Sequence, residues 1–227
     1  MEKPLPSAQV YSENIVGYQT LGLPAGYQMV TSTFVPTLST GESLRLGDIV
    51  PVNFSGATGD LVQFFNLNGT AAIETRATYY EGYGWFDFDT NEPIDNKTIP
   101  VGTGMFVYSS QENAEFVVAG EVKLDPIELP IASGYTVVGN SSPVPITLED
   151  VIPSNFSGAN GDLIQFFNSN GDGTVLTRAT YYEGYGWFDF DTNAPLDSAV
   201  LNPGDAFFVY ATDGSAMFAF PGIDVTN

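Results

Sequence analysis

The sequence contains no cysteine and no histidine, and only six of its 227 residues are lysine or arginine. Without cysteine, disulfides, thiolate metal sites and cysteine nucleophiles are excluded. Without histidine, the commonest general base, the Ser-His-Asp arrangement and the usual zinc ligands are excluded as well. Catalysis would have to depend on carboxylates, tyrosine or lysine, and we therefore expect a protein that is not an enzyme and holds no cofactor.

Positive charge is scarce, because 27 acidic residues stand against the six basic ones and give a net charge of −21. Such a surface repels phosphate backbones and anionic lipid headgroups, so no nucleic-acid partner is expected. It suits neutral sugars, divalent cations or solubility alone. Long apolar runs are also missing: none approaches the roughly 18 residues that span a bilayer, and no membrane insertion is expected.

The composition points to the cell exterior. Lysine is sparse, whereas threonine, asparagine, glycine and aromatic residues are abundant. Residues 1–9 lack the apolar segment of a signal peptide, but Ser7, Ala8 and Gln9 look like the small-residue junction that remains after one is removed. We expect an extracellular or cell-surface protein.

One segment of the chain is written twice. TRATYYEGYGWFDFDTN occurs without a change at 75–91 and at 177–193, an offset of 102 residues that also relates Pro51 to Pro153 and Gly102 to Gly204. Further upstream, Gly26 matches Gly134 at an offset of 108. The repeat predicts two homologous domains in tandem, at residues 1–124 and 125–227.

Within each unit, short apolar runs alternate with glycine, proline and asparagine at a spacing of about 8–12 residues, which indicates an all-β fold, a small sandwich or barrel. Asn68-Gly69 and Asn170-Gly171 predict tight hairpin turns. Residues 43–50 and 147–152 are amphipathic and predict one short helix in each unit.

The two chain ends carry a related pattern of bulky apolar residues followed by glycine, which also occurs at 117–120. If the terminal strands are related, they could meet between molecules by strand addition at a sheet edge, or each could cap its own sheet. The residues concerned are Ile15, Val16 and Gly17 at one end and Phe220 and Gly222 at the other.

Several motifs resemble secreted bacterial all-β tandem-repeat proteins of uncharacterised function. They are GYQMV at 26–30, GYTVV at 134–138, the Gly-Tyr-Gly-Trp turn and PGDAFFV at 203–209. The resemblance implies export and an all-β fold, and it supplies no catalytic residues.

Three constellations could carry chemistry. Aromatic rings beside carboxylates suit sugar binding, which makes Tyr83, Trp85, Tyr185 and Trp187 a candidate glycan platform, although core packing is the favoured interpretation of these aromatic residues. The glycine-bent segment with Asn168, Asn170 and Asp172 could hold Ca²⁺ or be a plain hairpin turn, since its counterpart in the first unit lacks the acid.

The third constellation is a set of charges that recur in both units. A pair of the recurring carboxylates could form a glycosidase site, but a structural bridge to the recurring arginine is the favoured interpretation. Asp89-Thr90-Asn91 is expected to cap a turn. The recurring residues of the first unit are Arg76, Asp60, Glu81, Asp87, Asp89 and Asp95.

The sequence thus predicts a non-enzymatic extracellular structural or surface protein that associates with itself end to end through its terminal β-strands. The alternative is a carbohydrate-binding module. Its partners would be other copies of the chain or glycans.

Overall fold

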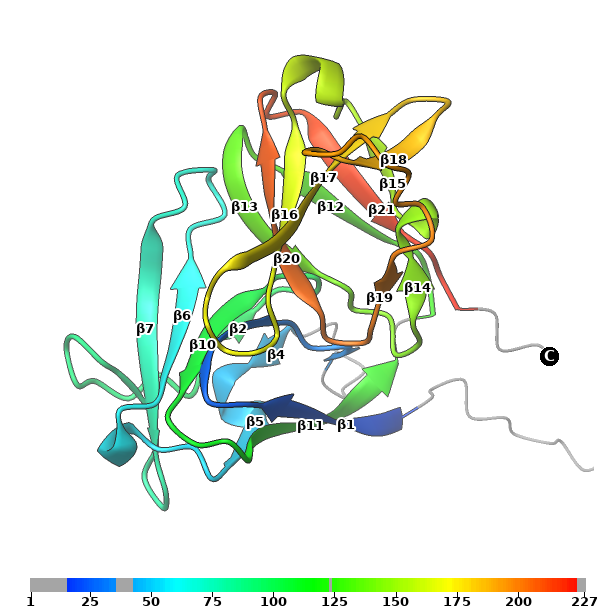
Figure 1. The fold of residues 1–227 in the computed structure, drawn as a ribbon. Coiled ribbons are helices and arrows are strands. Elements are labelled where there is room, and N and C mark those ends of the chain that lie inside the picture. Colours follow the sequence, from blue (N-terminus) through cyan, green and yellow to red (C-terminus); the bar gives the residue numbers. More distant parts are fainter. Residues whose placement is uncertain (1–15, 36–42, 123, 224–227) are drawn as a thin grey trace, which may run out of the picture.

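The computed structural model describes residues 16–35, 43–122 and 124–223 (Figure 1). Over these residues the chain is all-β, with four 3₁₀ turns and no α-helix, and it consists of two homologous units, as the sequence predicts. Every pairing between named strands joins two strands of the same unit. The first unit ends with β11 (Ala114–Val122), and the second begins with β12 (Ile127–Ile131).

The first unit is built around two antiparallel sheets. One sheet has the order β1-β11-β3, with β5 also paired to β11. The other has the order β2-β10-β6-β7-β8. A short third pair joins β4 to β9. The remaining strands are β1 (Val16–Leu23), β2 (Gly26–Val30), β3 (Phe34–Val35), β4 (Leu44–Arg45), β5 (Ile49–Val52), β6 (Leu61–Phe65), β7 (Ile73–Tyr80), β8 (Gly84–Asp87), β9 (Thr98–Ile99) and β10 (Met105–Ser109).

The second unit repeats this plan with sheets β12-β21-β15 and β13-β20-β16-β17-β18 and the pair β14-β19. Its further strands are β13 (Gly134–Gly139), β14 (Ile146–Thr147), β15 (Ile152–Ser154), β16 (Leu163–Phe167), β17 (Val175–Tyr182), β18 (Gly186–Asp189), β19 (Val200–Leu201), β20 (Ala206–Ala211) and β21 (Ala216–Phe220).

The period-2 alternation of the strands places one face of each sheet in a core. In β10, Met105 and Val107 are buried in the core of the first unit, whereas Phe106 and Tyr108 lie on the opposite face. Trp85 lies within that core, with its ring centroid 5.9 Å from that of Phe116. Trp187 packs in the same way in the second unit, so each unit has its own core.

The predicted short helices are single 3₁₀ turns, η1 (Leu46–Asp48) and η3 (Leu148–Asp150). Each turn is closed by an acid that accepts a hydrogen bond from a backbone N–H: Asp48 from Arg45 at 2.8 Å, and Asp150 from Thr147 at 2.8 Å. The strands β5 and β15 follow at once, which leaves no room for a second helical turn.

The first terminal strand pairs within its own unit. In β1, Gly17 lies opposite Gly120 of β11, so these two copies of the apolar-glycine pattern are antiparallel partners and not equivalent strands. The counterpart of β1 in the second unit is β12, which pairs with β21. Phe220 ends β21, Gly222 lies just beyond it, and Ile15 lies outside the described residues.

The two units are joined by reciprocal contacts. The N–H of Tyr27 donates to the carbonyl oxygen of Gly171 at 2.7 Å, and the N–H of Tyr135 donates to that of Gly69, also at 2.7 Å. Tyr135 follows the equivalent of Gly26, and Gly171 is the equivalent of Gly69, so each hairpin loop contacts the opposite unit in the same way. The contact is therefore isologous, as across a twofold axis.

Aromatic side chains reinforce this junction. The ring of Phe65 lies 5.4 Å from that of Phe208, and the ring of Phe106 lies 5.9 Å from that of Phe167. These are again equivalent pairs with the units exchanged, and they pack around the buried Met29, Val137 and Ala206. In Figure 1 the first unit (blue to green) lies below and to the left of the second (green to red), with the hairpin loops between them.

Candidate functional site

Most of the recurring acids have a structural role in the fold. Asp60 and its counterpart Asp162 are the most deeply buried of them. Asp60 is 1% exposed and accepts four hydrogen bonds: from the backbone N–H of Ser55 (2.8 Å) and of Ser110 (2.7 Å), and from the hydroxyls of Thr58 (2.9 Å) and Ser110 (2.7 Å). It thereby fixes the 3₁₀ turn η2 (Gly56–Thr58) against the end of β10. Asp162 does the same with Ser157 and Thr212. Neither carboxylate is available for catalysis.

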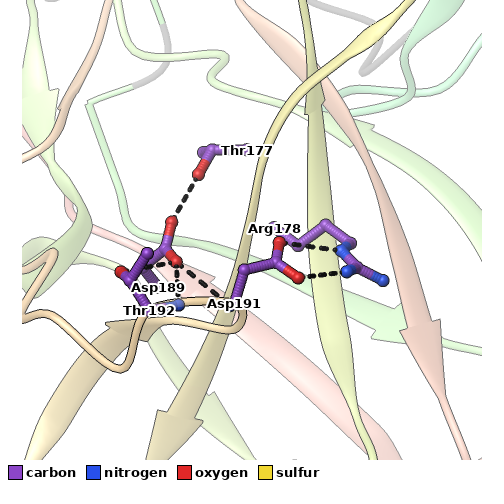
Figure 2. A network of polar contacts seen from close by, with 5 residues as sticks. All are labelled: Thr177, Arg178, Asp189, Asp191 and Thr192. Carbon is purple, nitrogen blue, oxygen red and sulfur yellow. Dashed lines mark hydrogen bonds and ion pairs between the residues drawn. The ribbon is translucent and has the colours of Figure 1, made fainter.

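The recurring arginine forms the predicted bridge. Arg76 binds Asp89 through two of its nitrogens, with 3.0 Å between Nε and Oδ2, and Arg178 binds Asp191 in the same way, with 3.2 Å between the corresponding atoms. Figure 2 shows the second pair, with the carboxylate facing the guanidinium. The structural interpretation of this motif is confirmed. Because the pair is half exposed and screened by solvent, it contributes little to stability.

The turn after β8 is capped mainly by Asp87, which precedes the expected segment 89–91, although the Thr90 hydroxyl of that segment accepts from the N–H of Glu92 at 3.4 Å. Asp87, and not Asp89, accepts hydrogen bonds from the N–H groups of Asp89 (2.9 Å) and Thr90 (2.8 Å). In the second unit Asp189 takes this role and also accepts from the hydroxyl of Thr177 at 2.8 Å (Figure 2). That hydroxyl, together with the hydroxyl and N–H of Thr192, lowers the pKa of Asp189 to about 2.

The two tryptophans lie in the cores and not on the surface. The indole N–H of Trp85 donates to the carbonyl oxygen of Ile49 at 3.4 Å, and that of Trp187 donates to Val151 at 3.1 Å. Asp95 accepts from the backbone N–H of Trp85 at 3.0 Å, which accounts for another recurring acid. A glycan platform that includes the two indole rings is therefore excluded by their burial, whereas Tyr83 and Tyr185 are exposed.

The loop considered for calcium has its oxygens occupied. Asp172 Oδ1 accepts from the N–H (2.8 Å) and the hydroxyl (2.6 Å) of Thr174, and Asn170 Nδ2 donates to Asp172 Oδ2 at 3.0 Å. Nδ2 of Asn168 donates to the same hydroxyl at 2.6 Å. In the described part of the chain, no group of three or more acidic residues is placed to hold a metal ion. The loop serves the junction, through the carbonyl of Gly171.

A shallow groove of about 450 Å³ lies at the tip of the β7–β8 hairpin of the first unit. Its walls include Glu81, for which no hydrogen bond is found within the described ranges, and Tyr83, which is 81% exposed. Neither residue has a structural role like those of the other recurring residues. The groove is lined by Ser55, Ala57, Tyr80, Glu81, Tyr83, Phe86 and Asn91.

The second unit has the same residue at all seven equivalent positions: Ser157, Ala159, Tyr182, Glu183, Tyr185, Phe188 and Asn193. The geometry is repeated too, because the rings of Tyr80 and Phe86 and those of Tyr182 and Phe188 are both 5.9 Å apart at 69°. Tyr185 is 80% exposed. We call these two sets of seven residues the hairpin-tip sites.

The sequence analysis did not single out Tyr80 and Phe86, because the two rings come together only when the chain reverses between them. The chain reverses at Glu81-Gly82-Tyr83, with φ values of +77° at Gly82 and +99° at Gly84. The reversal pairs Tyr79 with Trp85 on the core face and leaves Tyr80 and Phe86 together on the outer face. Gly82 and Gly84, which predicted a turn, were the signal that could have placed Tyr80 and Phe86 on the same face.

Comparison with models of protein families, with curated proteins and with solved structures finds no match for this chain. Over the described residues, no helix has the length and apolar character that a membrane crossing would require. The site is therefore interpreted from its own geometry.

Proposed function

We propose that the protein is a non-enzymatic extracellular surface protein that binds glycans through its two hairpin-tip sites. One observation carries this proposal: the side chains of Glu81 and Tyr83 are exposed, make no hydrogen bond or ring contact with the described residues, and recur unchanged in the second unit. The fold accounts for most other recurring residues of the 17-residue segment, through the core, the arginine bridge and the turn cap.

The chemistry of the groove suits a neutral sugar. The rings of Tyr80, Tyr83 and Phe86 offer apolar faces for a pyranose, and the carboxylate of Glu81 can accept hydroxyl protons. Anionic ligands are disfavoured by the net charge of −21.

Binding without hydrolysis is favoured by the number of carboxylates. Glycoside hydrolysis ordinarily uses two carboxyl groups on either side of the scissile bond. Glu81 is the one acid among the residues that line the groove. Asp87 and Asp89, the nearest acids in the sequence after it, are engaged in the turn cap and the arginine bridge.

The test is isothermal titration calorimetry with oligosaccharides of β-1,4-linked glucose, xylose and N-acetylglucosamine. The double variant Tyr83→Ala/Tyr185→Ala should lose at least tenfold in affinity for whichever oligosaccharide binds. Tyr18→Ala, which removes an equally exposed tyrosine from β1, should bind as the parent does. Affinity that survives the double variant, or no binding to an array of neutral glycans, would refute the proposal.

Two identical sites also predict bivalent binding. On an immobilised glycan, a single variant such as Tyr83→Ala should lose more affinity than it does in solution, because it removes the avidity of the second site. Equal losses on the surface and in solution would show that only one site engages.

Self-association is the second candidate function, and an exposed apolar face favours it. The sheet whose central strand is β11 has an exposed apolar face. Its side chains that are more than half exposed include Val16 and Tyr18 on β1 and Val50 on β5. A second copy could cover this face. Light scattering over a wide concentration range tests it: Tyr18→Asp should abolish any oligomer, and a strict monomer counts against assembly. Removing residues 1–21 is a poorer test, since Leu21 belongs to the core.

A further inference from the structure

Two cavities lie at equivalent places in the junction between the units. The larger, of 670 Å³, is lined by β1 and β2 of the first unit and by the residues before β20 of the second. The smaller, of 370 Å³, is lined by β12 and β13 and by the residues before β10. Leu21 and Val30 in the larger cavity correspond to Leu129 and Val138 in the smaller cavity. The linings of the two cavities can therefore be compared position by position. The larger is called here the junction cavity.

The polarity of the two cavities has diverged. The junction cavity has Gln28, Asn202 and Asp205 where the smaller cavity has Thr136, Pro100 and Thr103. Ser169 likewise takes the place of Leu67. The hairpin-tip residues stayed identical between the units, whereas these residues did not. The junction cavity therefore has an acid and two amide side chains that its counterpart in the other half of the junction lacks.

These polar groups leave two hydrogen-bond acceptors without a donor. Asp205 Oδ2 accepts from the N–H (2.7 Å) and the Nδ2 (3.2 Å) of Asn202, but Oδ1 receives no hydrogen bond from any residue that the structure describes. Gln28 is buried, and its Nε2 donates to the carbonyl oxygen of Pro24 at 2.8 Å. Its Oε1, within the same described ranges, has no donor. Burial also raises the pKa of Asp205, as expected for a carboxylate without a cation beside it.

The rest of the lining is mixed: Thr20, Asn168 and Thr177 belong to it, together with several apolar side chains. Leu21, Met29, Phe166 and Leu196 contribute side chains from both units, and among the described residues no lysine or arginine lines the cavity. A ligand that suits this lining donates hydrogen bonds to the two free acceptors and packs an apolar body against the apolar side chains. A volume of 670 Å³ lies in the range of cavities that bind small molecules, and such sites occur preferentially between domains.

We propose that the junction cavity binds a small organic cation, a primary amine with an apolar body. Its ammonium group donates to Asp205 Oδ1 and Gln28 Oε1, and its body packs against Leu21, Met29 and Leu196. This proposal goes beyond glycan binding and is independent of it, because the hairpin-tip residues do not line the cavity.

The test uses three probes of one shape: phenethylamine, 2-phenylethanol and 3-phenylpropionate. Binding is followed by ¹H–¹⁵N chemical shifts in 0.15 M salt, which weakens non-specific attraction to the acidic surface. Phenethylamine should shift the amides of residues 20–30 and 199–206 and bind at least tenfold more tightly than the alcohol, and the carboxylate should not bind.

Asp205→Asn should lower the affinity for phenethylamine at least tenfold, and Asp213→Asn, which removes an acid outside the cavity lining, should not. Leu176→Trp, at an exposed position on the cavity rim, should block binding by bulk and leaves Asp205 in place. Three results would each overturn the proposal: equal binding of amine and alcohol, shifts scattered over surface carboxylates, or full affinity in the Asp205→Asn variant.

Discussion

The backbone N–H of Tyr27 in the first unit donates a 2.7 Å hydrogen bond to the carbonyl oxygen of Gly171 in the second. Gly171 has a φ of +81°, and a Cβ at this position would collide with the carbonyl oxygen of Ala25. The hairpin loop can approach the other unit this closely only because its turn residue has no side chain.

Gly171→Ala should therefore destabilise the protein by about 2–4 kcal/mol, the sum of backbone strain and a displaced junction. The control is Gly59→Ala, since Gly59 has a similar φ of +87° but no atom within 4 Å of the added Cβ. It should cost about 1 kcal/mol. Urea unfolding of both variants measures the difference; equal costs would mean that the junction contributes nothing to stability.

The aromatic contacts across the junction should be measurable as coupling. Phe65→Ala and Phe208→Ala in a double-mutant cycle should show a coupling free energy of about 0.5–1.5 kcal/mol, as expected for rings 5.4 Å apart. Phe65→Ala combined with Phe156→Ala, in the separate core of the second unit, should be additive. Additivity in the first cycle would show that the units do not pack through these rings in solution.

Buried and exposed acids should differ sharply in their contribution to stability. Asp60→Ala leaves buried N–H groups of Ser55 and Ser110 without an acceptor and should cost about 3–5 kcal/mol. Asp89→Ala removes only a half-exposed ion pair and should change the stability far less than Asp60→Ala does. Denaturant midpoints of the two variants check this, and a small effect of Asp60→Ala would contradict the role of Asp60 as an anchor of the fold.

The acid stability of the protein should depend in part on Asp189. Its folded pKa of about 2 lies below the value of about 3.9 expected in the unfolded chain. As the pH falls, the unfolded chain binds the proton first, so this contribution is complete above about pH 4 and is lost between about pH 4 and pH 2.

Thr177→Val removes the hydroxyl that is the largest cause of this shift and should raise the pKa of Asp189 in an NMR titration of the carboxyl carbons. Thr75→Val is the matched control. Asp87 is held low chiefly by the N–H of Thr90, and Thr75 is not among the causes of its shift, so its pKa should not change. An unchanged pKa of Asp189 in the Thr177→Val variant would contradict the hydrogen bond from the Thr177 hydroxyl to Asp189.

Local sequence signals predicted much of the fold. The glycines of the hairpins, the alternation of β10 and the pairing of Arg76 with an acid all follow from neighbouring residues, and the offset of 102 defines the two units. The pairing of β1 with β11 could not be predicted in the same way, because Gly17 and Gly120 are about 100 residues apart and their patterns look like copies and not partners.

The junction and the hairpin-tip sites were harder to predict, because they too depend on residues that only the folded chain brings together. Phe65 and Phe106 occupy outward-facing positions of their strands, where the sequence alone does not distinguish a surface from a junction. Tyr80 and Phe86 come together only because the hairpin reverses the alternation. Trp85, the most conspicuous aromatic residue of the repeat, lies in the core, as the favoured interpretation of its sequence context expects.

The exchange of equivalent contacts between the halves has a consequence for the ancestry of the molecule. An isologous interface is what two separate copies of one polypeptide form when they dimerise. Gene duplication followed by fusion would convert such a dimer into this chain and leave the interface intact. In a single fused chain the halves can differ, so a position that is necessarily the same in both subunits of a true dimer can change in one half alone, as Asp205 and its counterpart Thr103 do.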